Sequence, residues 1–81
     1  MNIQEIDNTV KRFLVEELEM NEATIKPDAR LKEDIGIDSL DYVDIAIMVE
    51  EKFGFRIRPD EMKQTKTYAD FCNFIAKRLT A

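Results

Sequence analysis

Apolar residues recur at the three- and four-residue spacing of amphipathic helices along most of the sequence, and this periodicity predicts an all-α fold. The first helical segment begins after Asn2, whose side chain can cap a helix with Glu5 in the capping-box position. We expect this helix to end near Glu19. Its apolar face is formed by Ile3, Ile6, Val10, Phe13, Leu14 and Leu18.

The second helical segment starts at the Asp38-Ser39 step, where either side chain can cap a helix, and runs to about Phe53 with Gly54 as its stop. It carries two apolar stripes. The stripe expected to face the core comprises Tyr42, Ile45, Ala46, Val49 and Phe53. The other stripe is interleaved with acidic residues and comprises Leu40, Val43 and Ile47. This pattern favours a partner-binding helix over a central helix that is buried nearly all round.

A short helix of about one turn is predicted to open at Pro59, and a third main helix to begin after Thr67, with Asp70 completing a box-like cap. Residues 20–38 form a loop longer than the ~12–15 residues usual in a small domain, so we expect it to be anchored or functional. Its expected apolar anchors are Ile25, Leu31, Ile35 and Ile37. The chain is therefore predicted to form one domain, residues 1–81: a small four-helix bundle with three main helices, one short helix and a long loop between the first two.

The composition excludes several kinds of site. Histidine is absent and cysteine occurs once, which rules out a histidine-activated nucleophile, a histidine-bearing zinc site and an internal disulfide. Cys72 shares a helix face with Tyr68 and is expected to be a buried apolar residue rather than a reactive one. Its single thiol fits a reducing compartment, and neither a signal peptide nor a segment of transmembrane length is found. We therefore expect a cytoplasmic protein without membrane contact.

Charge is distributed unevenly. The net charge of −5 argues against nucleic acid as a partner. From residue 33 to residue 51 there are seven acids and no base, namely Glu33, Asp34, Asp38, Asp41, Asp44, Glu50 and Glu51. Such a window is a candidate docking surface for a basic partner, and the alternative is an ordinary solvated helix face. A calcium-binding domain is excluded because no stretch has the ligand spacing of an EF-hand.

Ser39 lies where the long loop, the helix start and the acidic window meet. Without a general base its hydroxyl is a poor nucleophile, but the free N–H groups and dipole of a helix N-terminus favour a phosphate there. The same residue type at the same place is also what an ordinary N-cap requires. The local physics leaves a phosphate-bearing modification and a plain cap open.

The run Asp34-Ile35-Gly36-Ile37-Asp38-Ser39-Leu40-Asp41 resembles the phosphopantetheine attachment site of acyl carrier proteins, whose pattern is Asp-Leu-Gly-x-Asp-Ser-Leu followed by an acid. The resemblance extends over nearly the whole chain. It implies that Ser39 bears a covalent 4'-phosphopantetheine arm, on which acyl groups are carried as thioesters in fatty-acid, polyketide or related lipid biosynthesis. The aspartate before Ser39 favours an acyl carrier over a peptidyl carrier.

The resemblance also implies how partners bind. A phosphopantetheinyl transferase and acyl-transferring and synthase enzymes would present basic patches to the second helix of a monomeric carrier that is not itself an enzyme. The residues implied in this contact are Asp38, Leu40, Asp41, Val43, Asp44, Ile47, Glu50 and Glu51. The alternative is a carrier-like structural subunit or adaptor that uses the acidic helix without carrying a substrate. An acyl chain on the arm would fold into the core, in a space lined by Tyr42, Ile45, Val49, Phe71 and Ile75.

Overall fold

The three periodic segments form the helices α1 (Ile3–Glu16), α2 (Ser39–Phe53) and α4 (Tyr68–Thr80), and Pro59 opens the short helix α3 (Pro59–Gln64). The computed structural model describes residues 2–80. Within these residues the only β-type pairing is an isolated bridge between Arg30 and Thr67. The predicted all-α architecture, with three main helices and one short helix, is confirmed.

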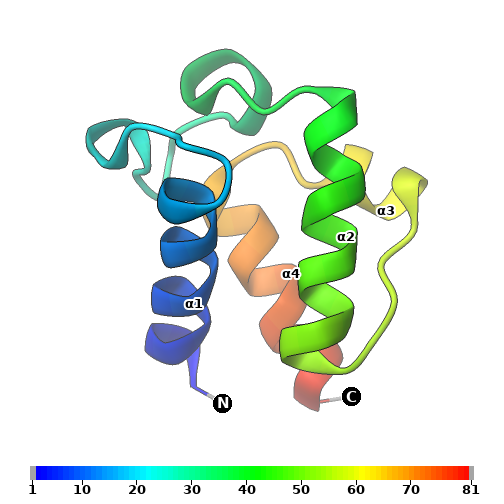
Figure 1. The fold of residues 1–81 in the computed structure, drawn as a ribbon. Helices are drawn as coiled ribbons and strands as arrows, with labels where there is room; N and C mark the ends of the chain where they lie inside the picture. The colour runs from blue at the N-terminus through cyan, green and yellow to red at the C-terminus, as the bar shows by residue number, and fades with distance from the viewer. Residues whose placement is uncertain (1, 81) are drawn as a thin grey trace.

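The helices form a bundle in which α1 and α2 run in opposite directions and α4 packs against α1 (Figure 1). α2 begins at the end of the molecule opposite the start of α1 and the end of α4 (Figure 1). The residues leading into α2 therefore lie at one end of the bundle, and the connector after α2 runs back from the other end of that helix to α3 (Figure 1). Within residues 2–80, no helix is both long and apolar enough to cross a membrane.

The core is formed by residues of all four helices, but Ile3, which was predicted to lie on the apolar face of α1, is 50% exposed. The buried helical residues of the core are Ile6, Val10 and Leu14 of α1, Ile45, Met48, Val49 and Phe53 of α2, Met62 of α3, and Tyr68, Phe71, Cys72 and Ile75 of α4. The burial of Cys72 confirms its predicted role as a small apolar core residue. Met48 lies on neither stripe identified in the sequence, so its burial widens the core face of α2.

α1 ends three residues before the expected position near Glu19. The chain leaves the helix at Glu17, whose N–H still donates to the carbonyl oxygen of Phe13 at 2.9 Å. Glu19 then adopts a left-handed backbone with φ of 57°, a conformation in which helices commonly terminate. This reversal brings Leu18 and Met20 back against the core, where both are half-buried. Leu18 therefore packs from the loop rather than from the helix.

The long loop contains two short helical turns, so its prediction as irregular chain was partly wrong. The first is a 3₁₀ turn (Glu22–Thr24) capped by Asn21, and the second a single π-turn (Leu31–Ile35). Its four predicted apolar anchors, Ile25, Leu31, Ile35 and Ile37, are all buried. Backbone bonds from Leu31 N–H to Lys66 C=O and from Tyr68 N–H to Ala29 C=O, at 2.9 and 2.8 Å, fix this loop to the segment before α4.

Candidate functional site

The start of α2 is capped by Asp38, and Ser39 is the first residue of the helix. One carboxylate oxygen of Asp38 accepts hydrogen bonds from the N–H groups of Leu40 and Asp41, at 2.9 and 3.0 Å. The carboxylate of Asp41 accepts in return from the N–H of Asp38 at 3.1 Å, which completes a capping box. Of the two caps that the sequence left open, the structure selects Asp38.

Ser39 therefore takes no part in capping the helix. Its side chain is exposed, and its hydroxyl makes no hydrogen bond to any residue in 2–80. The two nearest carboxylates on the chain, those of Asp38 and Asp41, are both held by backbone N–H groups. Neither carboxylate is hydrogen-bonded to the hydroxyl, which is exposed and accessible to a base from another molecule.

The loop that precedes Ser39 is held in place by local hydrogen bonds. The carboxylate of Asp34 accepts from the backbone N–H of Arg30 at 2.8 Å and from its guanidinium at 3.2 Å. These bonds lower the pKa of Asp34 below its ordinary value. Gly36 follows with φ of 93°, a conformation that disfavours side chains, and Ile37 N–H donates to Leu31 C=O at 2.9 Å. The direction in which the chain enters α2 is thereby fixed.

Two grooves open beside Ser39. The first, here the apolar groove, lies between α2 and α3 and has a volume of about 520 Å³. Apart from Ser39 itself, it is lined by Tyr42, Val43, Ala46, Ile47, Glu50, Arg56, Ile57, Pro59, Met62 and Lys63. Its one acid, Glu50, lies 3.6 Å from the guanidinium of Arg56, so charge on this wall is largely compensated.

The apolar groove lies apart from most of the residues expected to surround an acyl chain. Of the five residues predicted to line it, only Tyr42 does so. The other four, Ile45, Val49, Phe71 and Ile75, are at most 3% exposed and belong to the packed core. The open apolar groove of this structure therefore lies beside α2, and an acyl chain among the four core residues stays a prediction.

The second groove, here the basic groove, has a volume of about 660 Å³ and lies between the loop before α2 and the residues around the end of α3. It is lined by Arg30, Leu31, Lys32, Glu33, Ile37, Asp38, Ser39, Tyr42, Lys63, Thr65 and Lys66. Burial is the main cause that raises the pKa of the Tyr42 phenol, and Glu33 adds to it. Ser39, Tyr42 and Lys63 line both grooves and so form their common edge.

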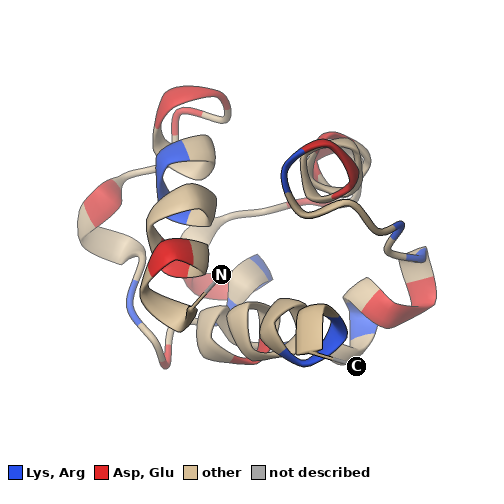
Figure 2. Cartoon of the chain, turned by 90° about the horizontal axis from the view of Figure 1, so that it is seen from below, with Lys and Arg blue, Asp and Glu red and all other residues tan. Residues whose placement is uncertain are grey.

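The second stripe of α2 faces solvent, as predicted. Leu40, Val43 and Ile47 are 78%, 60% and 51% exposed. Asp44, Glu50 and Glu51 are exposed on the same helix, whereas Asp38 and Asp41 are occupied by the capping box. Figure 2 looks along α2 and shows acidic residues around this helix, while basic residues follow in the connector to α3. The buried-all-round alternative for this helix is therefore excluded.

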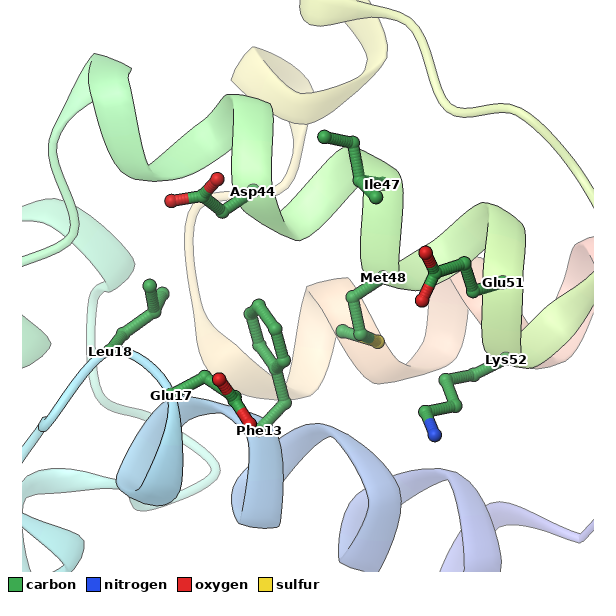
Figure 3. A pocket seen from close by; sticks show the side chains of 8 residues that line it. All are labelled: Phe13, Glu17, Leu18, Asp44, Ile47, Met48, Glu51 and Lys52. Atoms are coloured by element: carbon green, nitrogen blue, oxygen red, sulfur yellow. The ribbon is translucent and has the colours of Figure 1, made fainter.

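A third hollow, of about 460 Å³, joins this face of α2 to α1 (Figure 3). Phe13 of α1 and Met48 of α2 extend toward each other across it (Figure 3). Its carboxylates come from α2 and from Glu17, directly after α1. The full lining is Phe13, Glu17, Leu18, Asp44, Ile47, Met48, Glu51 and Lys52. The acidic surface thus continues past α2 to the end of α1.

The sequence did not single out Lys32 as part of the site, or predict that Lys63 and Lys66 lie beside Ser39. Their placement depends on the pairing of Leu31 with Lys66, residues 35 positions apart in the chain, and no local motif encodes that contact.

Comparison with known proteins gives two consistent findings. Residues 8–75 match a family model described as the phosphopantetheine attachment site. The chain is 35% identical to an acyl carrier protein of Thermosynechococcus vestitus over 81 residues, which is the full length of both chains. It is also 35% identical to an acyl carrier protein of Solidesulfovibrio magneticus over 69 residues, covering 85% of this chain and 88% of the relative.

Proposed function

Because the chain belongs to the acyl carrier protein family, whose members bear a covalently attached 4'-phosphopantetheine group, we propose that Ser39 is the residue that carries this group. The observation that supports this assignment most strongly is that Ser39 is the only serine in the chain. It lies inside the matched segment, and its hydroxyl is exposed while Asp38 performs the capping.

The surroundings of Ser39 suit a phosphodiester. An anion on the first residue of α2 lies at the positive end of the helix dipole. The two grooves leave space for an arm to lie on either side of Tyr42. When bound, the group supplies a terminal thiol that holds an acyl group as a thioester. The protein's own residues anchor and position this arm, and the chain acts as a carrier rather than as an enzyme.

We further propose that α2 is the surface through which enzymes bind the carrier. Its exposed apolar stripe, Leu40, Val43 and Ile47, supplies an apolar centre, and Asp44, Glu50 and Glu51 form a charged rim. Asp38 and Asp41 contribute at the start of the helix, beside Ser39. This arrangement is complementary to a transferase, acyltransferase or synthase that presents Lys and Arg around an apolar patch.

The proposed cargo is an acyl intermediate of fatty-acid, polyketide or related lipid biosynthesis, carried by a monomer in the cytoplasm. The apolar groove supports an alkyl cargo, because most of its lining is aliphatic or aromatic. The single domain of residues 1–81 supplies every residue that this function uses.

Intact-mass measurement tests the assignment. Incubation with coenzyme A and a promiscuous phosphopantetheinyl transferase is expected to add the mass of one phosphopantetheine to the wild type and none to Ser39→Ala. A matched control is Thr67→Ala, which removes a hydroxyl before α4 and should leave the transfer unchanged. Failure of the wild type to gain mass would instead favour a carrier-like structural subunit or adaptor, and a mass gain in Ser39→Ala would exclude Ser39 as the attachment residue.

A further inference from the structure

The basic groove carries more positive charge than its neighbours neutralise. Of its cations, Arg30 is bound to Asp34 at 3.2 Å and lies 3.9 Å from Glu33. The other three, Lys32, Lys63 and Lys66, are exposed and form no ion pair with any residue in 2–80. Glu33 and Asp38 also line the groove and Asp34 pairs with Arg30, so these three acids leave one positive charge of the four cations unbalanced. An anion in this groove therefore meets uncompensated positive charge.

The walls of the basic groove are fixed relative to each other. The Leu31 N–H bond to Lys66 C=O spans the groove's two sides, and the Arg30–Thr67 bridge lies beside it. Thr65 is buried on the α3 side, and its hydroxyl donates to Met62 C=O at 2.7 Å. The volume of about 660 Å³ is within the range of small-molecule sites. The basic groove is therefore a recess with a fixed backbone frame and exposed lysine side chains at its rim.

The chemical contrast with the apolar groove is clear, although both start at Ser39. In the apolar groove the cation Arg56 lies 3.6 Å from Glu50, and the remaining lining is mainly apolar apart from Lys63. An alkyl chain is favoured there because burial removes its surface from water. An acyl group that ends in a carboxylate would lose solvation in that groove and meet one unpaired cation there, Lys63, against three in the basic groove.

We propose that the basic groove is a subsite for acyl groups that bear a carboxylate, with Lys63 and Lys66 as the residues that hold it. The proposal rests on the proposed function, because it requires an arm on Ser39. It adds a substrate class to that function: dicarboxylic acyl groups lie against α3 and the loop before α2, and alkyl acyl groups lie between α2 and α3. Lys63, at the common edge, is reached from either side.

The test compares two acyl groups of equal carbon number that differ in terminal charge. The unmodified full-length protein is loaded with glutaryl- or pentanoyl-phosphopantetheine from amide-linked coenzyme A analogues, which do not hydrolyse during heating. The arm and its phosphodiester are the same in both forms, so a difference in melting temperature reports on the carboxylate. The comparison is made in Ala46→Leu, a variant whose apolar groove is filled. In this variant we expect the glutaryl form to melt about 2–4 °C above the pentanoyl form, which is the size expected for one exposed ion pair in a domain of this length.

The lysines are tested by substitution in the same background. Lys63→Gln with Lys66→Gln should abolish the difference, and so should 1 M salt, where the Debye length falls to about 3 Å. The matched control, Lys26→Gln with Lys77→Gln, changes two exposed lysines that line neither groove and should retain it. Equal melting of the two acyl forms, or a difference that survives loss of Lys63 and Lys66, would overturn the proposal. Absence of loading, seen by mass, would instead count against Ser39 as the attachment residue.

Discussion

The hydroxyl of Tyr68, at the start of α4, lies 2.6 Å from a carboxylate oxygen of Asp7 and donates a hydrogen bond to it. The same hydroxyl is 3.0 Å from the carbonyl oxygen of Asp7. The two residues are 61 positions apart, so this bond joins the first and last helices across the bundle. Burial, together with the bond, raises the pKa of Tyr68 above its ordinary value.

Removing this bond should destabilise the fold. Tyr68→Phe is expected to lower the free energy of unfolding by about 1–2 kcal/mol, because the bond goes to a charged group that is partly withdrawn from water. Urea unfolding at pH 7 measures the change. Tyr42→Phe is the matched control, since the Tyr42 hydroxyl makes no hydrogen bond within residues 2–80, and it should change stability by less than about 0.5 kcal/mol. Similar losses in both variants would contradict the assigned role of the Asp7 bond.

The buried thiol of Cys72 should make the stability of the fold depend on pH. Burial is the main cause that raises the pKa of Cys72 to about 11, from an ordinary value of 9.0. Between these values the unfolded chain releases a proton that the folded chain keeps, so stability falls as pH rises from about 9 to about 11. Cys72→Ala should show a shallower decline in urea titrations over this range. An unchanged slope would mean that Cys72 does not contribute to alkaline instability.

The same burial protects Cys72 from reaction. In the phosphopantetheine-bearing form, a disulfide reagent at pH 8 should titrate one thiol, that of the arm, and two after unfolding in urea. Rapid reaction of two thiols in the folded protein would show that Cys72 is accessible.

The capping box separates the roles of two adjacent residues. Asp38→Ala should lower stability by about 1 kcal/mol, because the N–H groups of Leu40 and Asp41 lose their acceptor. Ser39→Ala should change stability by only a few tenths of a kcal/mol, since alanine is tolerated at the first position of a helix. Thermal unfolding of the unmodified proteins compares them, and a larger loss for Ser39→Ala would assign the cap to the serine.

An alkyl cargo should stabilise the carrier. An octanoyl form is expected to melt above the unacylated phosphopantetheine form, because a chain bound only by the folded state shifts the equilibrium toward folding. Ala46→Leu, which fills the apolar groove, should reduce this rise by at least half, whereas Ala76→Leu on α4 should retain it. If both acylation states of the wild type melt together, the chain stays in solvent.

Binding of the phosphopantetheinyl transferase should depend on where the acidic residues lie on the carrier rather than on its net charge. Asp44→Lys with Glu51→Lys, two acids that face the hollow between α1 and α2 (Figure 3), should lower kcat/KM of the phosphopantetheinyl transferase about tenfold or more. Glu16→Lys with Glu22→Lys makes the same change in net charge away from that hollow, and should have little effect. Equal losses in the two double variants would show that only net charge matters.

The sequence predicted α2 closely because both of its ends carry local signals, Asp38 at the start and Gly54, with φ of 80°, at the end. The spacing of apolar residues along α2 also predicted its exposed stripe. The end of α1 was mispredicted because Glu19 adopts a left-handed backbone that its residue type does not announce. Whether a partner binds the stripe stays a prediction.

The grooves could not be predicted because each combines residues from distant segments. The basic groove depends on the backbone pairing of Leu31 with Lys66, and the apolar groove on how α3 settles against α2. Ile45, Val49 and Ile75, which were expected to line space for an acyl chain, are at most 3% exposed and belong to the core. Helical periodicity identifies a core face but does not reveal where that face leaves a gap.

Asp38 caps α2 while Ser39 is the proposed attachment residue, and this separation of roles affects how enzymes recognise the carrier. The hydrogen bonds that begin α2 all come from Asp38 and Asp41, so attaching or removing an arm at Ser39 leaves them unchanged. The amide protons of Leu40 and Asp41 should therefore exchange with solvent at the same rates in both forms. An enzyme that must tell a loaded carrier from an empty one then finds the same helix start each time, and has to discriminate by the arm or by the cargo in the grooves beside it.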